Sequence, residues 1–85
     1  MKPLLILVGA DKGGVGKTTT SRALLDFLAR RNVLARAFDT ENPRGTLHRF
    51  YPNIAEIIDL SRVRDQMKVL DTMQSAAVKV TVVDL

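Results

Sequence analysis

The sequence contains no cysteine and no tryptophan, and it has a single histidine. These absences exclude a disulfide framework, a thiolate nucleophile and a zinc site built from cysteine and histidine. No apolar run in the chain approaches the roughly 20 residues that a membrane-spanning helix needs. We expect the apolar start to be a buried strand rather than a signal peptide, because it passes directly into Asp11 and Lys12 without a small-residue cleavage pattern. We therefore expect a cytoplasmic protein without a transmembrane segment.

The composition is that of one small globular domain. The chain has 85 residues, of which 46% are hydrophobic and 26% are charged, so it can form a core, although a thin one. The formal net charge of +4 permits contact with nucleic acid or an acidic membrane surface. The arginines that such a surface would use are scattered rather than in one run, which favours solvated faces. They are Arg30, Arg31, Arg36, Arg44, Arg49, Arg62 and Arg64.

The first half of the chain predicts a strand, a helix and a second strand. Residues 4–10 form a continuous apolar run, typical of a parallel strand that is covered on both faces. A helical pattern follows from about residue 17 to residue 31, and Asn32 is expected as its left-handed cap. Residues 33–38 read as the second strand and lead into a turn-rich segment, residues 39–45. This order implies a right-handed crossover and parallel pairing of the two strands.

The second half is less regular. Residues 54–60 fit a short helix or a strand, and we favour the helix. Ser61 is then expected to cap a helix over residues 62–76, with an apolar stripe that we expect to pack in the core. The stripe consists of Val63, Met67, Leu70, Met73 and Ala77. A β-branched run, residues 78–85, predicts the last strand. The expected fold is α/β, a P-loop NTPase-like parallel sheet with flanking helices, incomplete and with about three strands.

Three of these strands end in groups suited to a binding site. The first runs into a glycine-rich stretch, the second ends at Asp39, and the third ends at Asp84. Because ligands bind at the carboxyl ends of the strands in an open α/β sheet, we expect the three ends to converge on one edge.

The glycine-rich stretch "KGGVGKTT", residues 12–19, has the parts of a phosphate site. Its glycines carry no Cβ atoms, so backbone N–H groups can surround phosphate oxygens, and the following helix directs further N–H groups to the same place. Lys17 adds a cation for the β- and γ-phosphates, and Thr18 supplies a hydroxyl ligand for Mg²⁺. The predicted cofactor-binding residues are Gly13, Gly14, Val15, Gly16, Lys17, Thr18 and Thr19.

The stretch departs from the general pattern G-x-x-x-x-G-K-[ST] at one place, because Asp11 stands where the first glycine is expected. With this departure it resembles, residue for residue, the deviant Walker A motif of the ParA/MinD group of ATPases, which also includes nitrogenase iron protein and arsenite-pump ATPases. The resemblance implies ATP and Mg²⁺ as cofactors. It also implies that Lys12 reaches across an ATP-sandwich homodimer and neutralises charge as the partner's γ-phosphoryl group leaves.

Two further segments carry the resemblance. "FDTENPRGTL", residues 38–47, is similar to the D-x-D-P segment of the family, which implies that Asp39 and Glu41 lie near Mg²⁺ and orient the attacking water. Glu41 stands where the second aspartate is usual, so it stays open which carboxylate positions the water. "VTVVDL", residues 80–85, resembles the Walker B strand, which implies that Asp84 holds the metal through water. The implied catalytic residues are Lys12, Lys17, Asp39 and Glu41, and the metal residues are Thr18 and Asp84.

The resemblance implies that residues 1–85 are the N-terminal segment of a single P-loop nucleotide-binding domain. Family members hydrolyse ATP to switch between dimer and monomer, and so position DNA, plasmids or cell-division cargo. The implied partners are a second copy of the chain, a ParB-like or other activator and non-specific DNA. In this family the Walker B strand lies between the other two, which leaves one side of residues 4–10 unpaired. Because later family segments have no counterpart here, we expect the chain alone to be too short for activity.

Two alternatives belong to other functional classes. One is a metabolic ATP-dependent ligase on the same scaffold, but such relatives commonly lack the strict "KGGVGKT" string, so Lys12 argues against it. The other is a truncated, non-catalytic module that binds phosphate without turnover.

Overall fold

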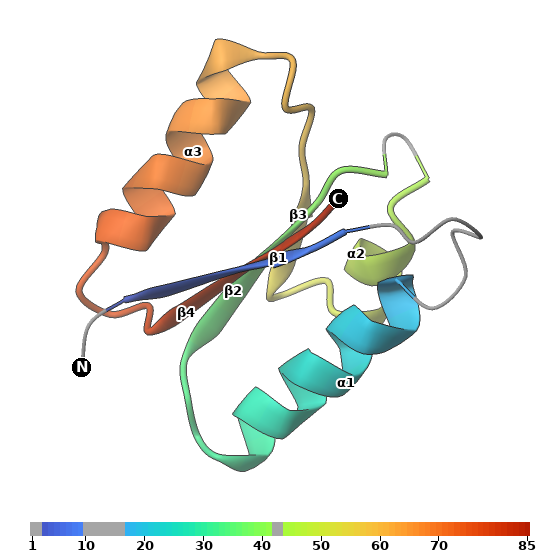
Figure 1. Cartoon of the computed structure of the whole chain (residues 1–85), viewed down its shortest axis with the longest axis vertical. Helices are drawn as coiled ribbons and strands as arrows, with labels where there is room; N and C mark the ends of the chain where they lie inside the picture. Colours follow the sequence, from blue (N-terminus) through green and yellow to red (C-terminus); the bar gives the residue numbers. More distant parts are fainter. Residues whose placement is uncertain (1–2, 10–16, 42–43) are drawn as a thin grey trace.

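The computed structural model describes residues 3–9, 17–41 and 44–85, and for Lys17 and Thr18 it describes the backbone alone. Strands and helices alternate along the chain (Figure 1). In chain order they are β1 (Leu4–Val8), α1 (Lys17–Arg30), β2 (Ala35–Asp39), α2 (Thr46–Phe50), β3 (Ala55–Ile57), α3 (Val63–Gln74) and β4 (Val80–Asp84). None of the helices in these ranges is long and apolar enough to cross a membrane.

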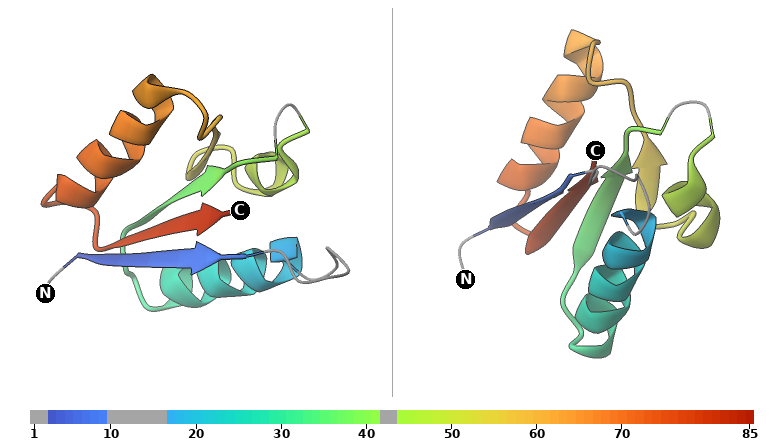
Figure 2. Two further views of the ribbon diagram at one scale, coloured as in Figure 1. Left: turned by 45° about the horizontal axis from the view of Figure 1, so that its top comes forward. Right: turned by 45° about the vertical axis from the view of Figure 1, so that its right-hand side comes forward.

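The four strands form one all-parallel sheet in the order β1-β4-β2-β3. The fold is therefore α/β, Rossmann- or P-loop-like, with helices on both faces of the sheet (Figure 2). The expected fold class is confirmed, with four strands in place of about three. β4 is inserted between β1 and β2, and β1 lies at the edge of the sheet.

The expectation of a helix over residues 54–60 is wrong, because this segment contains β3. The backbone N–H of Ala37 donates to the Ile54 carbonyl and that of Ile58 donates to the Asp39 carbonyl, at 3.0 and 2.9 Å. A helix of so few residues has little stability of its own. A strand at this place is stabilised instead by backbone hydrogen bonds to β2. The apolar pattern of a short segment cannot reveal such a long-range partner.

The end of α1 confirms the cap expected at Asn32. This residue has a positive φ of 56°. Its N–H donates to the Ala29 carbonyl at 3.1 Å, and the N–H of Val33 donates to the Leu28 carbonyl at 2.9 Å. These are the two hydrogen bonds of a Schellman motif, which satisfies the last carbonyls of the helix.

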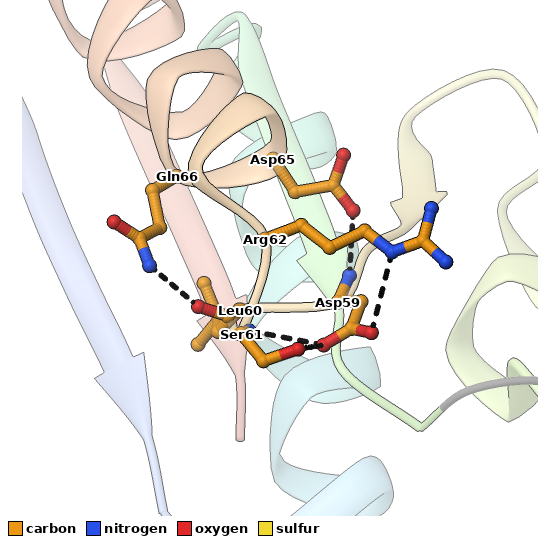
Figure 3. A network of polar contacts seen from close by, with 6 residues as sticks. All are labelled: Asp59, Leu60, Ser61, Arg62, Asp65 and Gln66. Carbon is orange, nitrogen blue, oxygen red and sulfur yellow. Dashed lines mark hydrogen bonds and ion pairs between the residues drawn. The ribbon is translucent and has the colours of Figure 1, made fainter.

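Two expectations for α3 are wrong. Its N-cap is Arg62, without a side-chain cap, because the N–H and hydroxyl of Ser61 donate to Asp59 Oδ1 at 2.9 and 2.6 Å (Figure 3). The helix is tied to the preceding turn by Asp65, which accepts a hydrogen bond from the Asp59 N–H at 2.8 Å. The apolar stripe is not in the core, since Val63 is 70% exposed and Met67 and Leu70 are each 50% exposed. α3 turns a different side, that of Val69, toward the sheet.

The core is divided by the sheet into two clusters of unequal size. The larger cluster lies on the face covered by α1 and α2 and consists of Val8, Leu25, Leu28, Ala35, Ala37, Leu47, Ala55, Val80 and Val82. The smaller lies under α3 and consists of Phe38, Ile58 and Val83, with Val69 packed against it.

Candidate functional site

The carboxyl ends of β1, β4 and β2 are level with one another. Val8 is the register partner of Asp84, and Asp84 is in turn the partner of Asp39. One further backbone hydrogen bond lies just beyond this row: the Leu85 N–H donates to the Val8 carbonyl at 2.9 Å. The three strand ends that the sequence singled out therefore do converge on one edge of the sheet.

Asp39 and Asp84 lie side by side in this row. Both are 1% exposed, and the alternation along β2 and β4 puts both side chains on the face of Ala37 and Val82, which α1 covers. Neighbouring strands are about 4.8 Å apart, so the two carboxyl groups are close. Burying two acidic groups together is costly unless N–H donors or a cation compensate for their charge.

For Asp39 the compensation comes from the backbone. Its Oδ1 accepts a hydrogen bond from the Glu41 N–H at 2.9 Å, and its Oδ2 accepts from the N–H groups of Leu47 and His48 at 2.9 and 3.3 Å. The last two donors belong to the first turn of α2, which has no side-chain cap of its own. Asp39 therefore caps α2 from eight positions earlier in the chain and holds the segment after β2 in place. Sequence reasoning missed this role.

Glu41 lies two residues beyond the end of β2 and is half-buried. Its Oε1 accepts a hydrogen bond from the Thr46 hydroxyl at 2.5 Å. Its carbonyl accepts a further bond from the Gly45 N–H at 2.6 Å. Glu41 is thus positioned at the start of α2, near Asp39 but closer to solvent. Asn42 and Pro43, which complete the motif, lie outside the described residues.

Thr40 helps to fix the register of β2 relative to β4. Its N–H and its hydroxyl both donate to the Asp84 carbonyl, at 3.1 and 2.9 Å. The double contact keeps the ends of these strands level, and with them the two aspartates. Sequence reasoning did not single out Thr40, and a threonine directly after a strand gives no local signal for such a contact.

The glycine-rich stretch joins β1 to α1. Lys12, Gly13, Gly14, Val15 and Gly16 lie outside the described residues, so the structure does not test the roles expected of them. The backbones of Lys17 and Thr18 form the start of α1, and Thr19 is exposed. α1 runs antiparallel to the strands, so its first turn lies at the carboxyl ends of β1 and β4 (Figure 2). The unpaired N–H groups of that turn are suited to an anion.

The described residues can be compared with what a bound metal ion would need. No cluster of three or more histidine, aspartate or glutamate side chains occurs within the described ranges that could hold a metal ion. Mg²⁺ commonly takes only one or two protein oxygens and completes its shell with phosphate and water. The Asp84 carboxylate, buried at the end of β4, is an oxygen donor of this kind, whereas the side chain of Thr18 lies outside the described part of the structure.

No family model, curated protein or solved structure matches the chain significantly. What the fold and site define is a small α/β domain with a four-stranded parallel sheet, flanking helices and two adjacent buried aspartates at its carboxyl edge.

Proposed function

We propose that the chain is an ATP-binding and ATP-hydrolysing segment of a dimerising ATPase of the ParA/MinD type, which positions DNA, plasmids or cell-division cargo. One observation carries most of the proposal. Asp84, at the end of β4, lies level with Asp39 and with the tip of β1, the strand that precedes the "KGGVGKTT" stretch in the sequence. A phosphate loop, a Walker B aspartate and a water-orienting carboxylate need this proximity.

In the proposed site the phosphates bind the backbone of residues 13–19 and the ammonium group of Lys17. The Thr18 hydroxyl and the Asp84 carboxylate would hold Mg²⁺, which when bound would supply positive charge beside the β- and γ-phosphates. The backbone of residues 13–19 and Lys17 would orient the phosphates. Burial of Asp84 supports this assignment, because a buried carboxylate attracts a cation more strongly than a solvated one.

Of the two acidic residues after β2, we assign water orientation to Glu41. Both carboxylate oxygens of Asp39 already accept backbone N–H groups, so it acts as a positioning residue for the segment that carries Glu41. Glu41 is half-buried, and its Oε1 accepts from a flexible threonine hydroxyl. A water molecule is a donor similar to the Thr46 hydroxyl, so Glu41 Oε1 is chemically suited to accept from an attacking water.

The test is calorimetric titration of the chain with ATP and magnesium, followed by measurement of phosphate release. We expect binding that Lys17→Ala reduces by at least tenfold, because it removes the cation facing the phosphates. Lys79→Ala is the matched control, since Lys79 precedes β4 at the opposite end of the sheet. Glu41→Gln is expected to keep binding and to lose hydrolysis, provided that the wild-type chain hydrolyses ATP.

Light scattering with ATP and magnesium tests the partner. A nucleotide-dependent dimer that Lys12→Ala abolishes supports the ATP-sandwich arrangement, whereas normal dimerisation of this variant contradicts the role given to Lys12. Equal ATP binding by the Lys17 and Lys79 variants would contradict the phosphate site itself. Phosphate transfer that depends on an added carboxylate substrate would point instead to the ligase class.

A further inference from the structure

We propose that Ser21 is a positioning residue of the nucleotide site. When ATP and magnesium bind, its hydroxyl donates a hydrogen bond to the Asp84 carboxylate and turns that group toward the metal. The inference rests on the proposed function and deepens it, because Ser21 lies in none of the three segments that carry the family resemblance.

The first observation is the Ser21 hydroxyl itself. The side chain is completely buried, and its Oγ atom has no hydrogen-bond partner among the residues that the structure describes. Such a hydroxyl destabilises a fold, because it has lost its hydrogen bonds to water and has gained none in the protein. Buried polar groups are rarely left in this condition, so the Ser21 hydroxyl needs an explanation.

Close packing of α1 on the sheet does not explain a serine here. A small side chain lets a helix approach a strand, but alanine does so equally well, has a higher helix propensity and carries no oxygen. The hydroxyl therefore lowers the stability of the chain without improving its packing. This is typical of a group whose partner arrives with a ligand.

The second observation is the place of Ser21 on α1. Leu25 and Leu28, four and seven residues later, belong to the larger core cluster together with Val80 and Val82 of β4. Positions at this spacing share one side of a helix, so Ser21 also faces the sheet. It does so near the start of α1, at the end of the helix that carries the proposed phosphate site.

Asp84 occupies the corresponding position on the sheet. α1 runs antiparallel to β4 and contacts it and both of its neighbours, β1 and β2. The step of about 6 Å along the helix from Leu25 back to Ser21 matches the step of about 6.6 Å along β4 from Val82 to Asp84. Ser21 and Asp84 therefore lie at the same end of the layer between α1 and β4, and neither is more than 1% exposed.

Of the two buried aspartates, Asp84 is the better partner for this hydroxyl. Both carboxylate oxygens of Asp39 already accept backbone N–H groups and hold α2. β4 is also the middle one of the three strands under α1, whereas β2 lies to one side. The Ser21 hydroxyl can rotate between staggered positions, so it can reach a new acceptor without movement of the helix.

A hydrogen bond to one oxygen of a carboxylate fixes the direction of the other oxygen. In the proposed site the Asp84 carboxylate would help to hold Mg²⁺, so its orientation determines how well the metal is bound. The Ser21 hydroxyl should therefore strengthen ATP binding only when magnesium is present.

The first test is thermal unfolding of the chain without nucleotide. We expect Ser21→Ala to raise Tm by about 5 °C, because it removes a buried hydroxyl that has no partner. Thr20→Ala is the matched control, since Thr20 is exposed on the same helix and its substitution gives only the gain in helix propensity. A Tm of Ser21→Ala no higher than that of the control would show that the hydroxyl already has a partner, and would overturn the proposal.

The second test is calorimetric titration with ATP, in magnesium and again in EDTA. We expect Ser21→Ala and Ser21→Cys to raise the Kd about tenfold in magnesium and to leave it unchanged in EDTA. The thiol fills the space of the hydroxyl but is a weak donor, so Ser21→Cys separates the hydrogen bond from packing. Thr20→Ala should bind ATP as the wild type does in both solutions.

The outcomes separate this role from the proposed function. If magnesium strengthens ATP binding equally in the wild type and in both Ser21 variants, the role of Ser21 is wrong and the nucleotide site stands. Weaker binding of the variants in EDTA as well contradicts the role too, because the hydroxyl then acts on the fold and not on the metal. If the wild-type chain binds no ATP, the nucleotide site fails, and the role of Ser21 fails with it.

Discussion

The two faces of the sheet are built from the same four strands but differ in how well they are covered. On the α1 and α2 face, nine buried hydrophobic residues form one cluster, and Leu47 and Val82 are completely buried. On the α3 face the corresponding cluster has three residues, and the leucines of β1 remain exposed. One helix cannot cover four strands, so the second face is incomplete at the β1 edge.

The polar contacts differ in the same way. On the covered face they join segments that are far apart in the chain, since the Arg22 guanidinium lies 3.8 Å from the centroid of the Phe50 ring and the Tyr51 hydroxyl donates to Asp26. Around the start of α3 the contacts stay within residues 59–66 (Figure 3), and a single exposed ion pair, Lys68 with Glu56 at 2.6 Å, is the polar contact between the described part of α3 and another element. Long-range contacts make a face unfold as one unit, whereas local contacts allow a helix to detach alone. The comparison therefore predicts a lower local stability for α3.

The largest expected effect comes from the same substitution made on both covering helices. Leu25 in α1 is 2% exposed, and Leu70 in α3 is 50% exposed. We expect Leu25→Ala to lower the free energy of unfolding by about 3 kcal/mol, because it leaves a cavity in the larger cluster. Leu70→Ala should cost less than about 1 kcal/mol, since half of its side chain already contacts water.

Urea denaturation of the wild-type chain and of the two variants measures both values. Equal losses for the two leucines would show that the faces are equally packed and would remove the basis of the comparison.

A smaller effect is expected at Gly45, which precedes α2 on the covered face. Its φ is +57°, and a Cβ atom there would lie 2.2 Å from Ile57 Cδ1. Gly45→Ala should therefore cost about 1–2 kcal/mol, from the left-handed backbone and the contact with Ile57. Gly9→Ala is the control, because a Cβ atom there would meet no atom within 4 Å.

The double variant Gly45→Ala/Ile57→Ala separates the two causes in thermal unfolding. If the steric contact matters, Gly45→Ala will cost less in the Ile57→Ala background than in the wild type, and the backbone cost will remain. A fully neutral Gly45→Ala would mean that the segment between β2 and β3 is looser than its contacts indicate.

The sequence predicted those features that depend on long apolar runs. Residues 4–8, 35–39 and 80–84 are strands, and once they are parallel and in register, Asp39 and Asp84 must end up level. The family resemblance added the position of β4 between β1 and β2, which chain order alone does not determine. In these three strands the local apolar pattern and the packing of the sheet agree.

The features that the sequence did not predict depend on contacts between distant residues. β3 forms because β2 offers it hydrogen bonds, and Asp39 caps a helix whose first turn begins seven residues later. The stripe grouped Val63, Met67 and Leu70 on one face of α3, although Ala77 lies beyond the end of the helix, but a stripe does not say which face meets the sheet. Here Val69 on the sheet and the Lys68 contact with Glu56 set the rotation of α3 and leave the stripe outside.

The smallest expected effect is at the rim of the covered face, where Tyr51 joins α2 to α1. Burial raises the pKa of Tyr51 above its ordinary value of 10.0, and the hydrogen bond to the Asp26 carboxylate raises this pKa further. Since the folded pKa exceeds the unfolded one, the contribution of this group to stability is complete below about pH 10 and is lost as the pH rises through the folded pKa.

Absorbance of the phenolate measures this pKa directly, because Tyr51 is the only tyrosine and there is no tryptophan. Asp26→Asn should lower the pKa of Tyr51, because it removes the hydrogen bond and the charge of the Asp26 carboxylate, which both raise this pKa. Asp71→Asn on α3 makes the same change on the other face and should have no effect. If Asp26→Asn leaves the titration unchanged, the long-range contact that joins α1 to α2 does not form in solution. The covered face would then be held together at this rim by packing alone.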